Sequence, residues 1–290
     1  QHYNSYQYFT TKEGLPTNFI YRCVQDKRGL LWVCTDAGVL RFDGKNFELY
    51  TTKEGLPDIE VLEIIMDSSG TIWANTFQHD PGYYNPLTNR FVNAKEDTAI
   101  AAVKDAPLTL SFPLKYGGVA FVNKTGTYFF GRNHMFLKSI IIPKFCIENK
   151  KDEFWIGTSE KIYQYTPTRL VDSLSLDPAM INNGSSVKVY GNNIYAVEKG
   201  ETILKCYDGI DFKNKTFRVT KKVFSTPILL FTITGNYVCV SLQNGEIYLL
   251  DKHSLEVLQK LDITATMNGA YEDTNGDLWI CTTDKGLIRA

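Results

Sequence analysis

Short hydrophobic runs of strand length, each bounded by turn residues, recur along the chain. Residues 30–35 (Leu-Leu-Trp-Val-Cys-Thr) and 39–42 (Val-Leu-Arg-Phe) lie between a turn at 26–29 and a turn at 43–44. Aspartate at the start of a tight turn can bond the following backbone, and glycine favours its exit. Alternation of such turns with short strands predicts small antiparallel sheets, and no helical periodicity interrupts it.

The same pattern returns at a fixed distance. Asp67 to Trp73 and Asp273 to Trp279 repeat the order of Asp26 to Trp32, and Asn149 to Trp155 repeats it with altered turn residues. Successive Trp residues are separated by one, two and three periods of about 41 residues, which together predict seven units. The residues predicted to be structural are Trp32, Trp73, Trp155, Trp279, Gly29, Gly70 and Gly276.

A repeat of this length built from strands and tight turns is typical of a β-propeller blade, and no helix pair is visible in it. We therefore predict an all-β fold, a seven-bladed β-propeller of four-stranded antiparallel blades, in one domain over residues 1–290. Blade one is predicted at about 17–50 and blade seven at about 269–290. A Trp at a fixed repeat position is expected to pack one blade on the next.

The N-terminus is predicted to complete the last blade. Residues 6–16 carry nearly the same sequence as residues 47–57, including the run Thr-Thr-Lys-Glu-Gly-Leu-Pro. Because residues 47–50 are the predicted outer strand of blade one, residues 6–11 are the predicted outer strand of blade seven and would close the ring.

Blade three is the least regular of the early repeats. Residues 95–116 break the pattern with Ala and Pro and are predicted as an insertion or long loop that shortens this blade. The turn from Asn123 to Gly126 resembles the others but is out of phase, so blade three is expected to resume at Gly118. The boundaries of blades five and six stay open.

Charge and hydropathy argue against two classes of partner. The chain has 31 Lys and Arg against 32 Asp and Glu and no basic run, which argues against nucleic-acid binding. No apolar stretch approaches the roughly 20 residues that span a bilayer, so this part of the protein is expected to make no membrane contact.

The six cysteines follow the repeat. Cys34 and Cys281, for example, each stand two residues after a Trp. Equivalent positions in different blades are expected to lie too far apart for a bridge, so we interpret the cysteines as small buried hydrophobic residues rather than disulfides. Cysteine usage therefore leaves the compartment open.

Neither catalysis nor a cofactor is indicated. The four histidines, His2, His79, His134 and His253, form no metal-binding pair, and no nucleophile elbow or phosphate loop is present. The Asp-rich turns lack the alternating ligands of a calcium loop. We predict no enzyme activity, no metal and no cofactor for this part of the protein.

The best candidate site lies on the propeller face that carries the variable loops. Blade two keeps its Trp and its Asp turn but replaces the short turn that follows with a longer aromatic and titratable loop. An exposed ring can stack on a sugar, while carboxylates and amides bond hydroxyl groups directionally. The candidate ligand-binding residues are Phe77, Gln78, His79, Asp80, Arg132, His134, Asp36, Asp58 and Glu60.

The runs Gly29-Leu-Leu-Trp32-Val-Cys-Thr-Asp36-Ala-Gly38 and Glu54-Gly55-Leu-Pro57-Asp58 resemble the two-component regulator propeller repeat. That repeat occurs in extracytoplasmic sensor regions of bacterial membrane histidine kinases, particularly of Bacteroidetes. The resemblance is clear in blades one, two and seven, partial in blade four, and absent in the others.

The resemblance implies a periplasmic sensor module of a membrane receptor in a two-component regulatory system, with signal transduction by a histidine kinase elsewhere in the chain. In such proteins a small β-sandwich, a membrane helix and the kinase follow the propellers, and some members sense oligosaccharides. The chain starts without Met and ends inside a predicted blade, so it is expected to be a fragment of such a receptor. Expected partners are a small-molecule or glycan signal, the downstream domains and a second copy in a homodimer.

Two alternatives from other classes remain at this point. A propeller enzyme of the lyase type would need His79, Asp80 and His134 to converge on a metal at the channel mouth. A scaffold propeller would instead bind other proteins. Metal analysis and the positions of these side chains separate the enzyme from the sensor.

Overall fold

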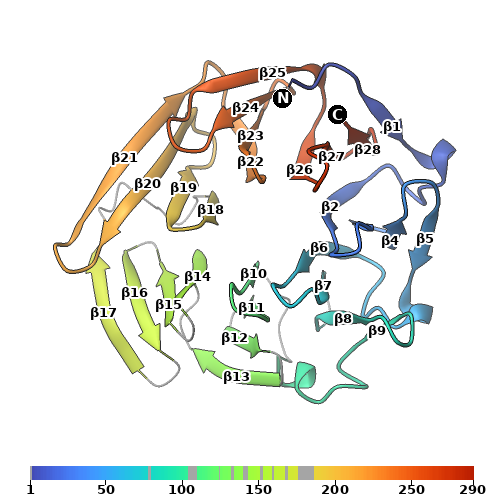
Figure 1. The fold of residues 1–290 in the computed structure, drawn as a ribbon, viewed down its shortest axis with the longest axis horizontal. Helices are drawn as coiled ribbons and strands as arrows, with labels where there is room; N and C mark the ends of the chain where they lie inside the picture. Colours follow the sequence, from blue (N-terminus) through green and yellow to red (C-terminus); the bar gives the residue numbers. More distant parts are fainter. Residues whose placement is uncertain are drawn as a thin grey trace. The chain divides into compact units, whose positions relative to one another are not determined.

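The computed structural model describes residues 2–77, 80–103, 110–123, 125–131, 134–139, 143–150, 153–158, 160–166, 169–175 and 186–290. Within these residues the strands form seven four-stranded sheets (Figure 1), and no α-helix is present. The predicted fold class, a seven-bladed β-propeller of four-stranded antiparallel blades, is therefore confirmed. The chain divides into a larger unit, 5–142 with 268–290, and a smaller unit, 1–4 with 143–267.

The larger unit holds blades one, two, three and, apart from Met267, seven. Their strands are β2 Ile20–Gln25, β3 Leu31–Thr35, β4 Gly38–Phe42 and β5 Phe47–Tyr50; β6 Val61–Met66, β7 Ile72–Thr76, β8 Gly82–Asn85 and β9 Arg90–Val92; β10 Leu110–Pro113, β11 Val119–Asn123, β12 Gly126–Gly131 and β13 His134–Ser139; and β26 Met267–Glu272, β27 Leu278–Thr282, β28 Leu287–Arg289 and β1 Gln7–Phe9. Three 3₁₀ helices connect them: η1 Thr11–Glu13, η2 Thr52–Glu54 and η3 Ile100–Val103.

The smaller unit holds blades four, five and six. Their strands are β14 Phe145–Lys150, β15 Glu153–Gly157, β16 Lys161–Thr166 and β17 Arg169–Ser175; β18 Ser186–Tyr190, β19 Asn193–Val197, β20 Ile203–Asp211 and β21 Thr216–Val223; and β22 Ile228–Ile233, β23 Tyr237–Leu242, β24 Glu246–Asp251 and β25 Val257–Thr264. Tyr3 is buried in this unit, where its backbone exchanges two hydrogen bonds of 3.0 and 2.7 Å with the side-chain amide of Gln259.

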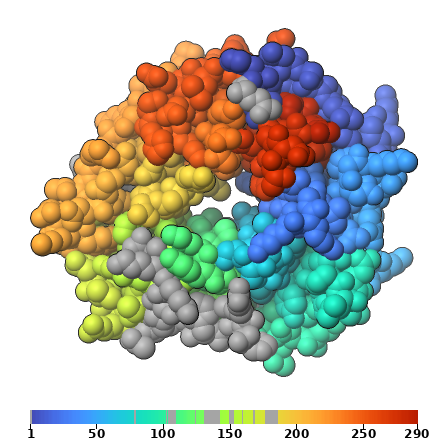
Figure 2. Space-filling model, viewed as in Figure 1, coloured from blue at the N-terminus to red at the C-terminus, as the bar shows by residue number. Residues whose placement is uncertain are grey.

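The N-terminal strand completes blade seven, as predicted. In the sheet order β1-β28-β27-β26, Gln7 pairs with Arg289 and Phe9 with Leu287. The ring of Phe9 lies 5.7 Å from that of Trp279 and 5.2 Å from that of Phe42 in blade one. In Figure 2 the red surface of blade seven lies directly beside the blue surface of blade one. The duplicated sequence thus marks a shared outer-strand position, while one domain over 1–290 stays a prediction.

The loops that leave the two outer strands share one geometry. Thr10 and Thr51 are the N-caps of η1 and η2, and the backbone N–H of each donates to the carboxylate of the Glu three residues later, at 2.7 and 2.8 Å. Each helix is followed by a C-cap glycine of positive φ, 105° at Gly14 and 93° at Gly55. A Cβ on Gly55 would lie 2.0 Å from the carbonyl oxygen of Phe91, so only glycine fits.

The Asp turns hold the structural Trp residues directly. In blades one, two and seven, the Asp carboxylate accepts hydrogen bonds from backbone N–H groups of its own turn and from the indole N–H of the Trp six residues later. The three indole bonds measure 3.0, 3.1 and 2.8 Å, in the pairs Asp26–Trp32, Asp67–Trp73 and Asp273–Trp279. We call each of these an Asp–Trp pair.

A buried carboxylate and a buried indole satisfy each other in these turns. Trp32 is fully buried and packs with Tyr50, Tyr84 and Phe91 in the apolar cluster between blades one and two. Burial works to raise the pKa of Asp26, but hydrogen bonds from Trp32, Arg28 and the backbone outweigh it and hold that pKa below its ordinary value. The predicted structural role of the Trp residues therefore includes a polar contact.

Blade three differs from its prediction. Its first strand, β10, and the 3₁₀ helix η3 both lie inside residues 95–116, so this blade has four strands rather than a shortened set. The first turn of the blade runs from Leu114 to Gly118, with a 2.9 Å hydrogen bond from the Leu114 N–H to the Gly118 carbonyl. The turn from Asn123 to Gly126 joins the second strand to the third, which explains why it is out of phase.

Candidate functional site

Five of the predicted ligand-binding residues lie at one end of blades one and two. Asp36 is in the turn between β3 and β4, and Asp58 and Glu60 precede β6. Phe77 and Asp80 belong to the loop between β7 and β8. The Asp turns join β2 to β3 and β6 to β7, so they lie at the opposite ends of β3 and β7. We call Asp36, Asp58, Glu60, Phe77 and Asp80 the loop-end cluster.

Glu60 connects the cluster. Its carbonyl oxygen accepts a 3.0 Å hydrogen bond from the backbone N–H of Phe77, and its carboxylate accepts a 2.6 Å bond from the hydroxyl of Tyr21. The backbone N–H of Glu60 donates to Asp58 Oδ1 at 3.4 Å. Asp80 is held to the end of β7 by a 3.3 Å bond from the hydroxyl of Thr76 to its carbonyl. Phe77 is thereby tied to the segment that enters the same blade, and Asp80 to the end of β7.

Tyr21 contributes a hydroxyl that stays protonated. Burial, the hydrogen bond to Glu60 and the nearby charge of Asp36 all raise the pKa of Tyr21 well above its ordinary value. The Tyr21 ring meets that of Phe19 edge-on, with 4.8 Å between centroids. The phenol is thus a fixed donor beside two acceptors.

Apolar surface lies next to these carboxylates. Phe77 and Ile59 are each 46% exposed, whereas most large apolar side chains of blades one and two are buried. An exposed ring beside directional acceptors suits a ligand that has both apolar faces and hydroxyl groups.

The other four predicted site residues are Gln78, His79, Arg132 and His134. Gln78, His79 and Arg132 lie outside the described residues, and His134 begins β13 of blade three. Among the residues that the structure does describe, no group of three or more His, Cys, Asp or Glu is arranged to hold a metal ion.

The sequence reasoning missed a row of polar residues on the first strands of the larger unit. Arg22 donates to the carbonyls of Tyr21, at 2.7 Å, and of Asn268 in blade seven. In blade two Glu63 accepts from the hydroxyl of Ser111 in blade three. The signal in the sequence that could have revealed this row is the presence of two charged residues, Arg22 and Glu63, in the middle of strands predicted to be the inner strands of their blades.

The repeat register shows how this row is accommodated. Arg22 and Glu63 both follow a β-bulge in their strand and stand four residues before the Asp of the turn, as Gly269 does in blade seven. A Cβ on Gly269 would lie 2.9 Å from Arg22 Cδ, so the glycine makes room for the guanidinium group of the neighbouring blade. The row lies on β26, β2, β6 and β10, which follow one another in Figure 1.

A family model described as two component regulator propeller matches residues 14–37. This stretch covers β2, the first Asp turn and β3, so the resemblance is confirmed for the repeat of blade one. No curated protein sequence matches the chain. Within the described residues, no helix is long and apolar enough to cross a membrane.

Solved structures of similar fold cover nearly the whole chain. The extracellular domain of the putative hybrid two component system BT3049 from B. thetaiotaomicron matches 98% of it with a TM-score of 0.70 and 17% identity. That of BT4673 from the same organism matches 100% with a TM-score of 0.72 and 14% identity. PorZ, a surface component of the type-IX secretion system of Porphyromonas gingivalis, matches 97% with a TM-score of 0.70 and 10% identity.

These likenesses establish the propeller fold and leave function open. The chain spans only 41%, 43% and 37% of the length of the three matched structures, in the same order. A sensor domain and a secretion component share the fold equally well, because one propeller supports many functions through its loops. The site of this chain must therefore be judged on its own residues.

Proposed function

We propose that the chain is the extracytoplasmic sensor propeller of a bacterial two-component sensor histidine kinase. The observation that carries the proposal is the coincidence of two comparisons: the family match at residues 14–37 and the nearly complete likeness to the extracellular domains of two putative hybrid two component systems. In this proposal the propeller is non-catalytic. A kinase, a membrane helix and a β-sandwich lie elsewhere in the full-length chain, which acts as a homodimer in the periplasm.

The signal is a small molecule rich in hydroxyl groups, such as an oligosaccharide, that binds at the loop-end cluster. Phe77 offers an exposed ring for the apolar face of a sugar. Asp58, in the segment that enters blade two, and Asp80, in the same loop as Phe77, offer carboxylates that accept hydrogen bonds from hydroxyl groups. The contacts of Glu60 with Tyr21 and Phe77 hold this surface in place before binding, which lowers the entropic cost of recognition.

The loop-end cluster is tested with the full-length receptor. The double variant Phe77→Ala, Asp80→Ala should bind the signal more weakly and raise the concentration for half-maximal kinase output by at least about tenfold, since losing one stacking contact and one acceptor costs about 1.4 kcal/mol or more. Leu87→Ala is the matched control, because Leu87 is a 94% exposed apolar residue in the turn between β8 and β9 of the same blade.

The result that contradicts the cluster is a normal response in the double variant at normal abundance. A full-length chain in which no kinase follows the propeller would contradict the sensor function itself. The two outcomes are read from different measurements, the dose response and the sequence downstream of residue 290.

A further inference from the structure

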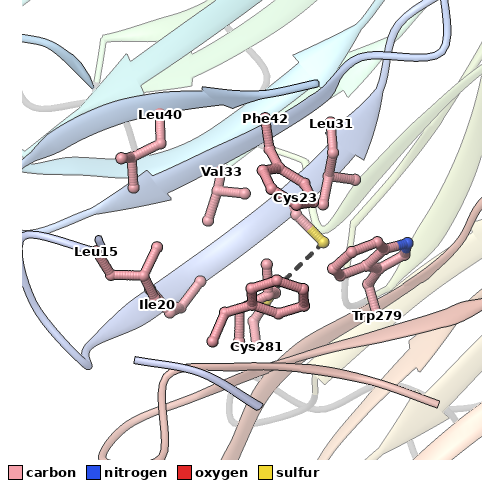
Figure 3. Close-up of a cluster of buried hydrophobic side chains, with 11 residues drawn as sticks. Leu15, Ile20, Cys23, Leu31, Val33, Leu40, Phe42, Trp279 and Cys281 are labelled. Carbon is pink, nitrogen blue, oxygen red and sulfur yellow. Dashed lines mark hydrogen bonds between the residues drawn. The ribbon is translucent and has the colours of Figure 1, made fainter. Parts of the chain in front are cut away.

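Two cysteine side chains meet between blade seven and blade one. Cys23 lies in β2 and Cys281 in β27, 258 residues apart along the chain, and their Sγ atoms are 3.5 Å from each other. Figure 3 shows the two sulfur atoms facing each other beside Trp279 and Ile20. Both residues belong to one apolar cluster and are 7% and 0% exposed. The two thiols are therefore direct neighbours in a buried apolar cluster.

The contact is particular to this pair of blades. Cys34 stands two residues after Trp32, as Cys281 stands two after Trp279, and it is equally buried. Cys34 nevertheless packs in the cluster that contains Ile64 of blade two, and its thiol donates to the carbonyl of Arg22 at 3.5 Å. The same repeat position thus has an apolar neighbour in one interface and a thiol in the other.

We propose that Cys23 and Cys281 are joined by a disulfide that links blade one covalently to blade seven. The two thiols lose two protons and two electrons as the S–S bond forms. The oxidant is the disulfide of a thiol–disulfide oxidoreductase in an oxidising compartment, and it is reduced to a dithiol in the exchange. This step rests on the extracytoplasmic placement proposed above.

Formation of the bond requires the two sulfur atoms to come closer than their present 3.5 Å. The sulfur atoms have to approach from van der Waals contact to a bond length of about 2.0 Å, which side-chain rotation provides when the Cβ atoms are already near each other. Burial is the main reason that the pKa of Cys23 is raised well above its ordinary value, so the thiolate needed for exchange is scarce once the blade has closed. The bond therefore forms while blades one and seven are coming together, and it is shielded from reductants afterwards.

The position of the link explains its value. Blade seven is built from both ends of the chain, and β1, which carries Phe9, forms its outer edge. A bond between residues so distant in sequence removes a large part of the conformational freedom of the unfolded chain. The linked form should therefore have a Tm several degrees higher than the reduced form.

The test compares the chain exported with a signal peptide with the same chain made in a reducing cytoplasm. Each sample is quenched in acid, alkylated under denaturing conditions and digested with trypsin without reduction. The exported chain should show two fewer alkylated cysteines than the six present, and a linked product of residues 23–27 with residues 261–285. The cytoplasmic chain should show all six alkylated and a lower Tm.

Two variants complete the design. Cys281→Ala should abolish the linked product and lower the Tm of the exported chain to that of the reduced form, whereas Cys34→Ala, at the same repeat position, should keep the product. Six alkylated cysteines in the exported, folded wild-type chain would overturn the proposal, as would a linked product that contains Cys34 instead. The readout does not involve signalling, so a failure here and a failure of the proposed sensor function are separate results.

Discussion

Blade one and blade three, which belong to the same unit, share one backbone turn but differ in its side chains: where blade one has a polar and a large aromatic residue, blade three has two apolar aliphatic residues. In blade one the Asp26 N–H donates to the Leu30 carbonyl at 2.8 Å, and in blade three the Leu114 N–H donates to the Gly118 carbonyl at 2.9 Å. Leu114 therefore stands where blade one has Asp26, and Ala120, six residues later, stands where it has Trp32. Leu114 and Ala120 are both buried.

The difference teaches that the Asp and the Trp are coupled. A buried carboxylate without donors and a buried indole N–H without an acceptor are each costly, so each residue makes the other tolerable. Where one is missing in blade three, so is the other, and the turn survives on its backbone hydrogen bonds. Blade four offers an intermediate case, because the buried Nε1 of Trp155 has no hydrogen-bond partner among the described residues.

The largest loss of stability is expected from removing β1, the outer strand that gives blade seven the same four strands as blade one. Deleting residues 1–16 takes away β1, Phe9 and Leu15, which pack against Trp279 and Phe42. We expect a loss of more than about 5 kcal/mol in unfolding free energy, since a buried Phe alone accounts for about 3–5. Urea unfolding measures it, with a chain lacking only residues 1–2 as control; an unchanged midpoint would contradict the closure of blade seven by β1.

The next effect is the loss of one complete Asp–Trp pair. Trp32→Ala removes a fully buried ring from the cluster between blades one and two and leaves the Asp26 carboxylate without its indole donor. We expect a loss of about 3–5 kcal/mol, measured by urea unfolding. A loss below about 1 kcal/mol would show that blade one, like blade three, does not depend on the pair.

A milder change separates the polar contact from the packing. Trp32→Phe keeps an aromatic ring but removes the N–H that donates to Asp26, and it should cost about 1–3 kcal/mol more than Trp155→Phe. Trp155 is the matched control because it is also buried, yet its Nε1 has no partner within the described part of the chain. Equal losses of unfolding free energy in the two variants would contradict a stabilising contribution from the hydrogen bond between Trp32 and Asp26.

The smallest effect is a pH dependence. Because the pKa of folded Asp26 lies below its unfolded value, its contribution to stability is present above about pH 4 and is lost as the pH falls through the folded pKa. The stability difference between wild type and Asp26→Asn, about 1 kcal/mol at neutral pH, should therefore shrink in acid. Unfolding midpoints between pH 7 and pH 3 check this, with the exposed Asp284→Asn as control; a constant difference would contradict it.

The sequence predicted the features that depend on the repeat itself. Strand and turn spacing gave the blade count, and the duplicated Thr-Thr-Lys-Glu-Gly-Leu-Pro run gave the strand that completes blade seven. The phase of blade three was missed because its Asn123 to Gly126 turn resembles the Asp turn although it joins a different pair of strands. Turn chemistry is local, so it does not reveal which two strands a turn connects.

Contacts between blades could not be predicted from the repeat pattern. Equivalent cysteine positions are far apart, but neighbouring blades bring non-equivalent positions together, as with Cys23 and Cys281. For the candidate site, the sequence identified the loop of blade two but not its attachment through Glu60 and Tyr21. That attachment depends on side chains 39 residues apart, which only the folded structure places in contact.

The Asp–Trp pairs also turn three indole groups into reporters of individual blades. In an NMR spectrum of the folded protein, the indole protons of Trp32, Trp73 and Trp279 should be shifted by their carboxylate acceptors, and that of Trp155 should not. Exchange of these protons with deuterated solvent requires the bond to open and water to enter. The exchange rates would therefore give the opening free energy of blades one, two and seven one by one, without any substitution.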